Sequence, residues 1–159
     1  HDLPTLMVES LSMQDLSSEQ LFEFFNENQD RSLYTIHFQT PTGFRSQGEY
    51  VLFPTMRLIF QSLMMKYARL VENRQDIEEE TLDYLVMHSR ITSYRLESSY
   101  FKVHGKKIPG FRGKLTFKIT GPNTLKAYAN MLLKFGEYSG LGMKTSLGMG
   151  GLELEERKD

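Results

Sequence analysis

Apolar and polar residues alternate along residues 33–40, and this period of two predicts a strand with one buried face. Its apolar positions are Tyr34, Ile36 and Phe38. The same alternation returns at residues 112–119, where Lys114 and Lys118 share the polar side. Residues 91–103 are rich in β-branched and aromatic side chains and predict the preceding strand, with a turn at 104–110. A last, shorter strand is expected at residues 150–156.

Two longer segments carry apolar residues at helical spacing instead. The first runs over residues 55–71, and the second opens at Gly121-Pro122, with Gly136 placed to end it. Two short helices are predicted from capping boxes. These boxes pair Ser17 with Gln20, flanked by a hydrophobic staple of Leu16 and Leu21, and Asp76 with Glu79.

From residue 33 the predicted order is strand, helix with an extra helix, strand, strand, helix, strand. This order is the ferredoxin-like βαββαβ arrangement of the α+β class, with the two longer helices on one face of an antiparallel sheet and the other face open. The expected strand order is 4-1-3-2 or its mirror. We interpret residues 1–32 as a lead-in, with a strand at 6–13, and residues 33–159 as the domain.

Charge is distributed unevenly although the whole chain has a formal net charge of −1. Residues 1–89 contain 6 Lys/Arg and 14 Asp/Glu, a balance of −8, whereas residues 90–150 contain 11 Lys/Arg and 2 acidic residues, a balance of +9. This basic half suggests a polyanion as partner, although an ordinary solvated basic surface explains it as well.

The segment GLGMKTSLGMGG, residues 140–151, contains five of the chain's 12 glycines. It is neither a Walker loop, because Met143 precedes Lys144, nor a dinucleotide fingerprint, because no helix follows it. Bare backbone, one cation and two hydroxyls could form an anion site for a phosphodiester. On this interpretation Gly142 and Gly148 let the backbone approach the ligand closely; a loop of tight turns that binds nothing is the alternative.

No metal or cofactor is expected, because the chain has no cysteine and its four histidines lack metal-ligand spacing. His37 is placed on the open face, where it could contact RNA or transfer a proton, but an ordinary surface or partly buried histidine is the favoured interpretation. The sequence has no apolar run near 18 residues and no basic-apolar leader, so a cytoplasmic protein without a membrane span is expected.

Three further stretches, together with the glycine motif, give a family resemblance. They are FQTPT at 38–42 followed by Phe44-Arg45, Phe53-Pro54 heading a helix with Phe60 and Leu63, and Gly110-Phe111-Arg112-Gly113 at the start of a hairpin strand. Over roughly residues 33–155 the chain resembles the CRISPR precursor-RNA processing endoribonucleases of the Cas-six type, within the repeat-associated RNA-binding superfamily.

The resemblance implies two ferredoxin-like domains in tandem and metal-independent cleavage of CRISPR repeat RNA by the 2′-hydroxyl beside the scissile phosphate. The general acid/base of such enzymes usually lies in the first domain, whereas this chain resembles the second, so its catalytic residues are unknown and it is uncertain whether it is itself an enzyme. CRISPR repeat RNA is the implied partner, and other CRISPR effector subunits are further candidates. The expected RNA-binding residues are Gly140, Gly142, Lys144, Thr145, Ser146, Gly148, Gly150, Arg112, Lys114, Lys134 and Arg45.

Two other functions fit the same pattern. One is a non-catalytic CRISPR RNA scaffold subunit, and the other is a ferredoxin-like ligand-sensing or oligomerisation module. Arg45 likewise has two interpretations, a phosphate contact or an ion pair with Glu49.

Overall fold

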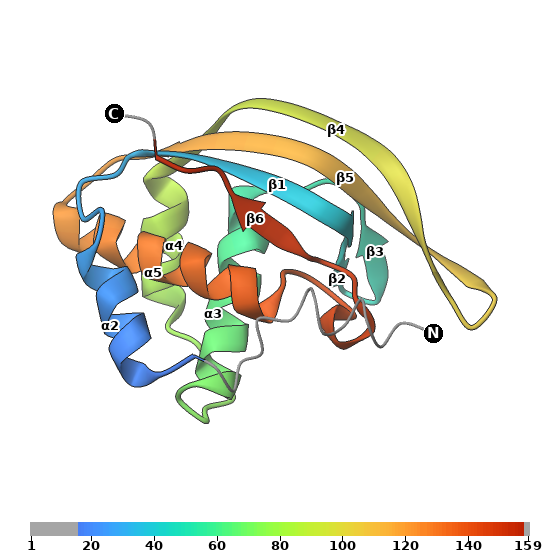
Figure 1. Ribbon diagram of the computed structural model, residues 1–159, viewed down its shortest axis with the longest axis horizontal. Helices are drawn as coiled ribbons and strands as arrows, with labels where there is room; N and C mark the ends of the chain where they lie inside the picture. Colours follow the sequence, from blue (N-terminus) through green and yellow to red (C-terminus); the bar gives the residue numbers. More distant parts are fainter. Residues whose placement is uncertain (1–15, 158–159) are drawn as a thin grey trace.

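A computed structural model describes residues 16–157 as one four-stranded antiparallel sheet layered against helices (Figure 1). The strand order is β4-β5-β1-β6, which is the mirror listing of the predicted 4-1-3-2 order. The strands are β1 (Leu33–Thr42), β4 (Ser89–Val103), β5 (Lys106–Ile119) and β6 (Leu152–Leu154). The ferredoxin-like prediction is therefore confirmed, and the strand expected at 6–13 lies outside the described residues.

The helices cover one face of the sheet and leave the other open, as Figure 1 shows. They are α2 (Ser18–Asn26), α3 (Met56–Leu70), α4 (Glu79–Met87) and α5 (Asn123–Ser139). Hydroxyl caps begin two of them: the Ser17 hydroxyl accepts from Gln20 N at 3.1 Å, as its predicted capping box requires, and the Thr55 hydroxyl accepts from Leu58 N at 3.1 Å.

The core lies between these two layers and is rich in aromatic rings. Tyr34 opposes Phe117 in the β1–β5 register, with ring centroids 5.6 Å apart. Phe60 of α3 meets Phe117 edge-on at 6.2 Å. All three side chains are fully buried, and burying apolar side chains of this size stabilises the fold by about 1.5 to 3 kcal/mol each. The alternation seen in the sequence thus marks the face on which the helices pack.

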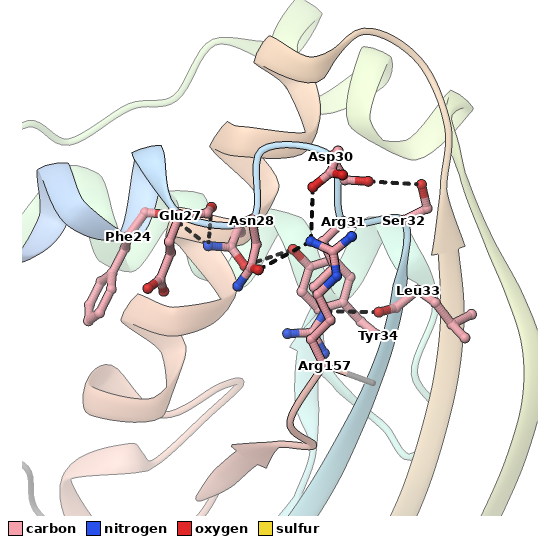
Figure 2. Close-up of polar contacts among 10 residues, drawn as sticks. Phe24, Glu27, Asn28, Asp30, Arg31, Ser32, Leu33, Tyr34 and Arg157 are labelled. Atoms are coloured by element: carbon pink, nitrogen blue, oxygen red, sulfur yellow. Dashed lines mark hydrogen bonds and ion pairs between the residues drawn. The ribbon is translucent and has the colours of Figure 1, made fainter. Parts of the chain in front are cut away.

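A buried polar network ties α2 and the end of β6 to this core (Figure 2). The Arg31 guanidinium donates to the Glu155 carbonyl at 2.9 Å and lies 4.2 Å from the centroid of the Tyr34 ring. The Tyr34 hydroxyl donates to Asn130 Oδ1 at 2.8 Å, and the Asn130 amide donates to the Phe24 carbonyl at 2.7 Å. Helix α2 therefore shares the hydrophobic core of the sheet and α5.

Two predicted helix boundaries are wrong. Helix α4 begins at Glu79 with Glu78 as its cap, and the Glu78 carboxylate accepts from the Thr81 hydroxyl, whereas Asp76 lies 3.7 Å from Arg74. The second capping box therefore does not form. Helix α5 continues past Gly136 to Ser139, and a Cβ at Gly136 would come within 2.8 Å of the Leu63 side chain. That glycine allows α3 and α5 to pack closely and does not end the helix.

The turn regions also differ from the sequence prediction. The turn between β4 and β5 is confined to His104 and Gly105, both with positive φ, so β5 starts at Lys106 and is longer than expected. Part of the expected loop after β1 forms a small hairpin of β2 (Phe44–Ser46) and β3 (Glu49–Val51). Strand β6 is shorter than the predicted 150–156.

Candidate nucleic-acid interface

The glycine-rich loop, residues 140–151, connects α5 to β6 and folds back on itself. Its two ends meet where the Leu141 amide donates to the Gly150 carbonyl at 2.9 Å. The loop also docks on the segment after β1: the Met143 amide donates to the Gly43 carbonyl at 2.9 Å and the Gly150 amide to the Pro41 carbonyl at 3.0 Å. The loop is therefore a fixed part of the domain.

Most glycines of this loop are packed against the protein. A Cβ at Gly142 would collide with the Gly43 carbonyl, and one at Gly150 would collide with the Leu141 carbonyl. A Cβ at Gly148 would come within 3.2 Å of the Phe101 ring, at the end of the long β4–β5 hairpin. The expectation that Gly142 and Gly148 leave space for a ligand is therefore wrong, because protein atoms take up that space.

The loop tip, Lys144, Thr145 and Ser146, differs from the rest of the loop. Within residues 16–157, the backbone amides of these three residues make no hydrogen bond, whereas every other amide of the loop donates to a protein acceptor. Lys144 and Ser146 are exposed, and Lys144 has a left-handed backbone with φ of 55°. The tip therefore offers amide donors, a cation and a hydroxyl to solvent.

A second basic surface lies on the open face of the sheet. We name it the open-face cations, and its members are Arg90, Arg95, Arg112, Lys114 and Lys118. All five side chains are exposed. In the β4–β5 register Arg90 opposes Lys118 and Arg95 opposes Lys114, so like charges stand side by side, while Glu97 opposes Arg112. The two like-charged pairs are unfavourable without an anion nearby.

Arg90 and Arg95 were missed by the sequence analysis, and a bulge is the reason. The two residues are five apart, so a regular strand would send them to opposite faces. The register shifts by one residue between Ile91 and Ser93, which returns both arginines to the face of Lys114 and Lys118. No feature of the sequence identifies this shift.

His37 lies on the open face, as predicted. It stands beside Lys114 of β5 and Glu153 of β6 in the register of the sheet. Its Nε2 is 3.0 Å from Glu155 Oε2, and both side chains are about one-third exposed. The histidine is therefore engaged by a carboxylate at the edge strand.

The remaining expected RNA-binding residues are not brought together with Lys114. Lys134 lies on α5, in the helix layer behind the sheet, so a continuous basic surface from Lys114 through Lys134 does not form. Arg45 lies on the β2–β3 hairpin with its guanidinium 5.1 Å from the centroid of the Tyr50 ring. Within residues 16–157 Arg45 therefore stacks on Tyr50 and forms no ion pair with Glu49.

Among residues 16–157, no group of three or more His, Asp or Glu side chains is placed to hold a metal ion. No helix in that range is both long and apolar enough to cross a membrane.

Comparison with known proteins decides the family. The sequence profile of the family described as CRISPR-associated endoribonuclease Cas6 matches residues 36–152, most of the chain. The chain belongs to the Cas6 family. The matched range contains the loop tip and all five open-face cations, and it ends before Glu155, the contact of His37.

Individual Cas6 proteins support the assignment. Over all 159 residues the chain is 66% identical to a CRISPR-associated endoribonuclease Cas6 of Streptococcus thermophilus, and it covers 65% of that protein. Over 148 residues it is 34% identical to a Cas6 of Mycobacterium tuberculosis (strain H37Rv), covering 47% of that protein. The chain thus spans between about half and two-thirds of the length of these relatives.

The fold is also shared with solved Cas6 structures. Thermus thermophilus Cas6 (TTHB231) superposes with a TM-score of 0.74 at 24% identity, covering 85% of this chain and 57% of that one.

Proposed function

We propose that this chain is the C-terminal, ferredoxin-like RNA-binding part of a Cas6 endoribonuclease, and that it binds CRISPR repeat RNA. On this proposal residues 33–159 form the RNA-binding domain and residues 1–32 lead into it. The observation that carries the proposal is the loop tip, where three amides without protein acceptors stand beside an exposed lysine.

A phosphodiester is the ligand that suits these donors. Its non-bridging oxygens accept hydrogen bonds from amides and hydroxyls, and its charge is neutralised by a lysine ammonium. None of these contacts depends on the base, so the loop tip fixes the path of the RNA strand and does not read its sequence. The glycines contribute indirectly, because they let the loop close and hold the tip in place.

The open-face cations provide the second part of the proposed interface. Arg90 beside Lys118 and Arg95 beside Lys114 repel each other in the free protein. An RNA strand laid over β4 and β5 would replace this repulsion with attraction and release counterions from the RNA. Binding is therefore dominated by phosphate contacts and falls steeply as salt is raised.

The cleavage step is proposed to be metal-independent and to take its acid/base from outside this chain. The family membership supports an endoribonuclease, and the described residues place no catalytic pair at the loop tip. His37 lies on the open face of the sheet in contact with Glu155, and the proposal gives it no catalytic role.

The experiment is a titration of labelled CRISPR repeat RNA with the protein. Binding is monitored by fluorescence anisotropy at several salt concentrations, in a buffer that contains a chelator. With six phosphate contacts to a single strand, the affinity should fall by about 300-fold between roughly 50 and 200 mM salt. A DNA strand of the same sequence tests whether the 2′-hydroxyl contributes. An affinity that does not change with salt, or an absence of RNA binding, would refute the proposal.

A further inference from the structure

A cavity of about 430 Å³ lies beside the glycine-rich loop. Three segments far apart in the sequence line it. The β2–β3 hairpin contributes Arg45, helix α3 contributes Lys66 and Arg69, and the loop contributes Gly142. The cavity therefore runs along α3 from Leu58 to Arg69, between this helix and the loop whose tip is the proposed RNA contact.

The charge of this cavity is one-sided. Its lining includes three cations and no acidic side chain. Lys66 is only 8% exposed, and its ammonium donates to the Thr145 hydroxyl at 3.1 Å. Within residues 16–157 neither Lys66 nor Arg69 forms an ion pair.

Burying a cation without a counter-ion is unfavourable, and the effect is visible on Lys66. Burial, with a smaller contribution from the positive charge of Arg69, lowers the pKa of the Lys66 ammonium to about 8. A core position of α3 could hold an apolar residue at no such cost. An anion bound in the cavity would offset both the cost of burying the Lys66 charge and its repulsion by Arg69.

The cavity also contains directed donors. The Ser62 hydroxyl oxygen accepts from the Gly142 amide at 2.9 Å, and within residues 16–157 its proton makes no hydrogen bond. Lys66 uses one of its three N–H bonds on Thr145, which leaves two. Arg45 and Arg69 add exposed guanidinium groups at the rim. Tetrahedral oxyanions suit such a set of hydroxyl, ammonium and guanidinium donors.

We propose that the cavity lined by Arg45, Lys66 and Arg69 binds a phosphate group of the same RNA strand that the loop tip contacts. The inference rests on the proposed function. Lys66 links the two sites, because its ammonium holds the hydroxyl of Thr145, the central residue of the tip. The cavity is larger than one phosphate needs, so part of the adjoining nucleotide also fits.

Inorganic phosphate is the first probe, because it tests the cavity without RNA. Thermal unfolding is followed in phosphate and in chloride of matched ionic strength. Phosphate should raise the unfolding temperature of the wild-type protein, and Lys66→Met and Arg69→Gln should each reduce that rise by at least half. Lys126→Met, which removes a lysine of α5 outside the cavity, should keep the rise. If phosphate stabilises all four proteins equally, the cavity is not the site and the inference is overturned.

RNA binding then identifies the source of the phosphate. Arg69→Gln, at an exposed position, should weaken repeat-RNA affinity about five- to tenfold, and inorganic phosphate should compete with RNA for the wild-type protein. If Arg69→Gln removes the phosphate effect but leaves RNA affinity unchanged, the cavity takes free phosphate or an acidic protein segment and the inference about RNA is wrong. If no variant or wild-type protein binds RNA, the proposed function fails, while the phosphate titration still reports on the cavity.

Discussion

The ammonium of Lys66 donates to the hydroxyl of Thr145 at 3.1 Å, which connects the middle of α3 to the tip of the glycine-rich loop. The two residues are 79 positions apart in the sequence. This contact places a buried cation directly behind the residues proposed to hold RNA phosphate. The state of Lys66 should therefore affect both the stability of the domain and its interaction with anions.

The first prediction concerns the dependence of the unfolding free energy on pH. Because the pKa of Lys66 is about 8 in the folded protein and 10.5 in the ordinary state, the unfolded chain binds more protons than the folded one between these values. Stability should thus rise with pH in this window, by about 2 kcal/mol between pH 7 and 9.5. Chemical denaturation of the wild type and Lys66→Met at both pH values measures the difference, and the variant should lack this rise.

Saturating phosphate should suppress the same rise, since an anion beside Lys66 returns its pKa toward 10.5. Measurements stop at pH 9.5 because burial raises the pKa of Tyr34 and Tyr128, which makes their ionisation oppose folding at higher pH. Identical pH profiles for wild type and Lys66→Met would show that the lysine is not held in an unfavourable charged state.

The second prediction concerns Gly142. Valine at this position would have to adopt a φ of +83° and would place its Cβ against the Gly43 carbonyl. We expect Gly142→Val to lower the free energy of unfolding by about 3 kcal/mol or more. Gly105→Val is the matched control, because Gly105 also has positive φ, +75°, but nothing lies within 4 Å of its Cβ position.

The control should cost only about 1 kcal/mol, the backbone part of the penalty. Urea denaturation of both variants separates strain from collision. Equal losses in the two variants would mean that the loop moves away from Gly43 without cost, contrary to the packing role assigned to this glycine.

The third prediction concerns the open-face cations. Arg95→Ala removes one partner of the Arg95–Lys114 pair, so stability should stay within about 0.5 kcal/mol while RNA affinity falls and the salt slope drops by about one phosphate contact. Arg57→Ala is the control, because Arg57 lies on α3 and is paired with Asp83 at 2.6 Å. A salt slope that Arg57→Ala and Arg95→Ala change equally would show that charge alone, regardless of place, governs binding.

Much of this fold could be predicted from the sequence, because burial on one face leaves a regular pattern. Tyr34, Ile36 and Phe38 marked β1, and Thr55 marked the start of α3. The open-face position of His37 followed from the same alternation. Such inferences work where each side chain is oriented by a regular strand or helix.

Local irregularities and tertiary contacts of this fold leave no such pattern in the sequence. The bulge after Ile91 places Arg95 beside Lys114, and no residue pattern reveals it. Gly136 resembles a helix end but serves the contact with Leu63. The basic cavity combines residues near positions 45, 66 and 142, which only the folded chain brings together. Lys66 in particular was hidden in an apolar helical stripe.

The fourth prediction concerns catalysis. This chain should not cleave CRISPR repeat RNA by itself in chelator, because its acid/base is proposed to lie elsewhere in the enzyme. His37→Ala should remove the contact with Glu155 and change RNA cleavage by the complete enzyme less than tenfold. Gel analysis of end-labelled RNA measures both. Metal-free cleavage by this chain that His37→Ala abolishes would instead make His37 the acid/base.

The central claim is that the amides of Lys144, Thr145 and Ser146 donate to RNA phosphate, and amide NMR spectra recorded during an RNA titration test it most directly. The amides of Leu141, Met143 and Gly150 are internal controls, because they already donate to backbone carbonyls of the protein. With repeat RNA, the three tip amides should show the largest shifts in the loop, and the shifts should shrink as salt is raised. Unchanged tip amides in a protein that is saturated with RNA would contradict the account.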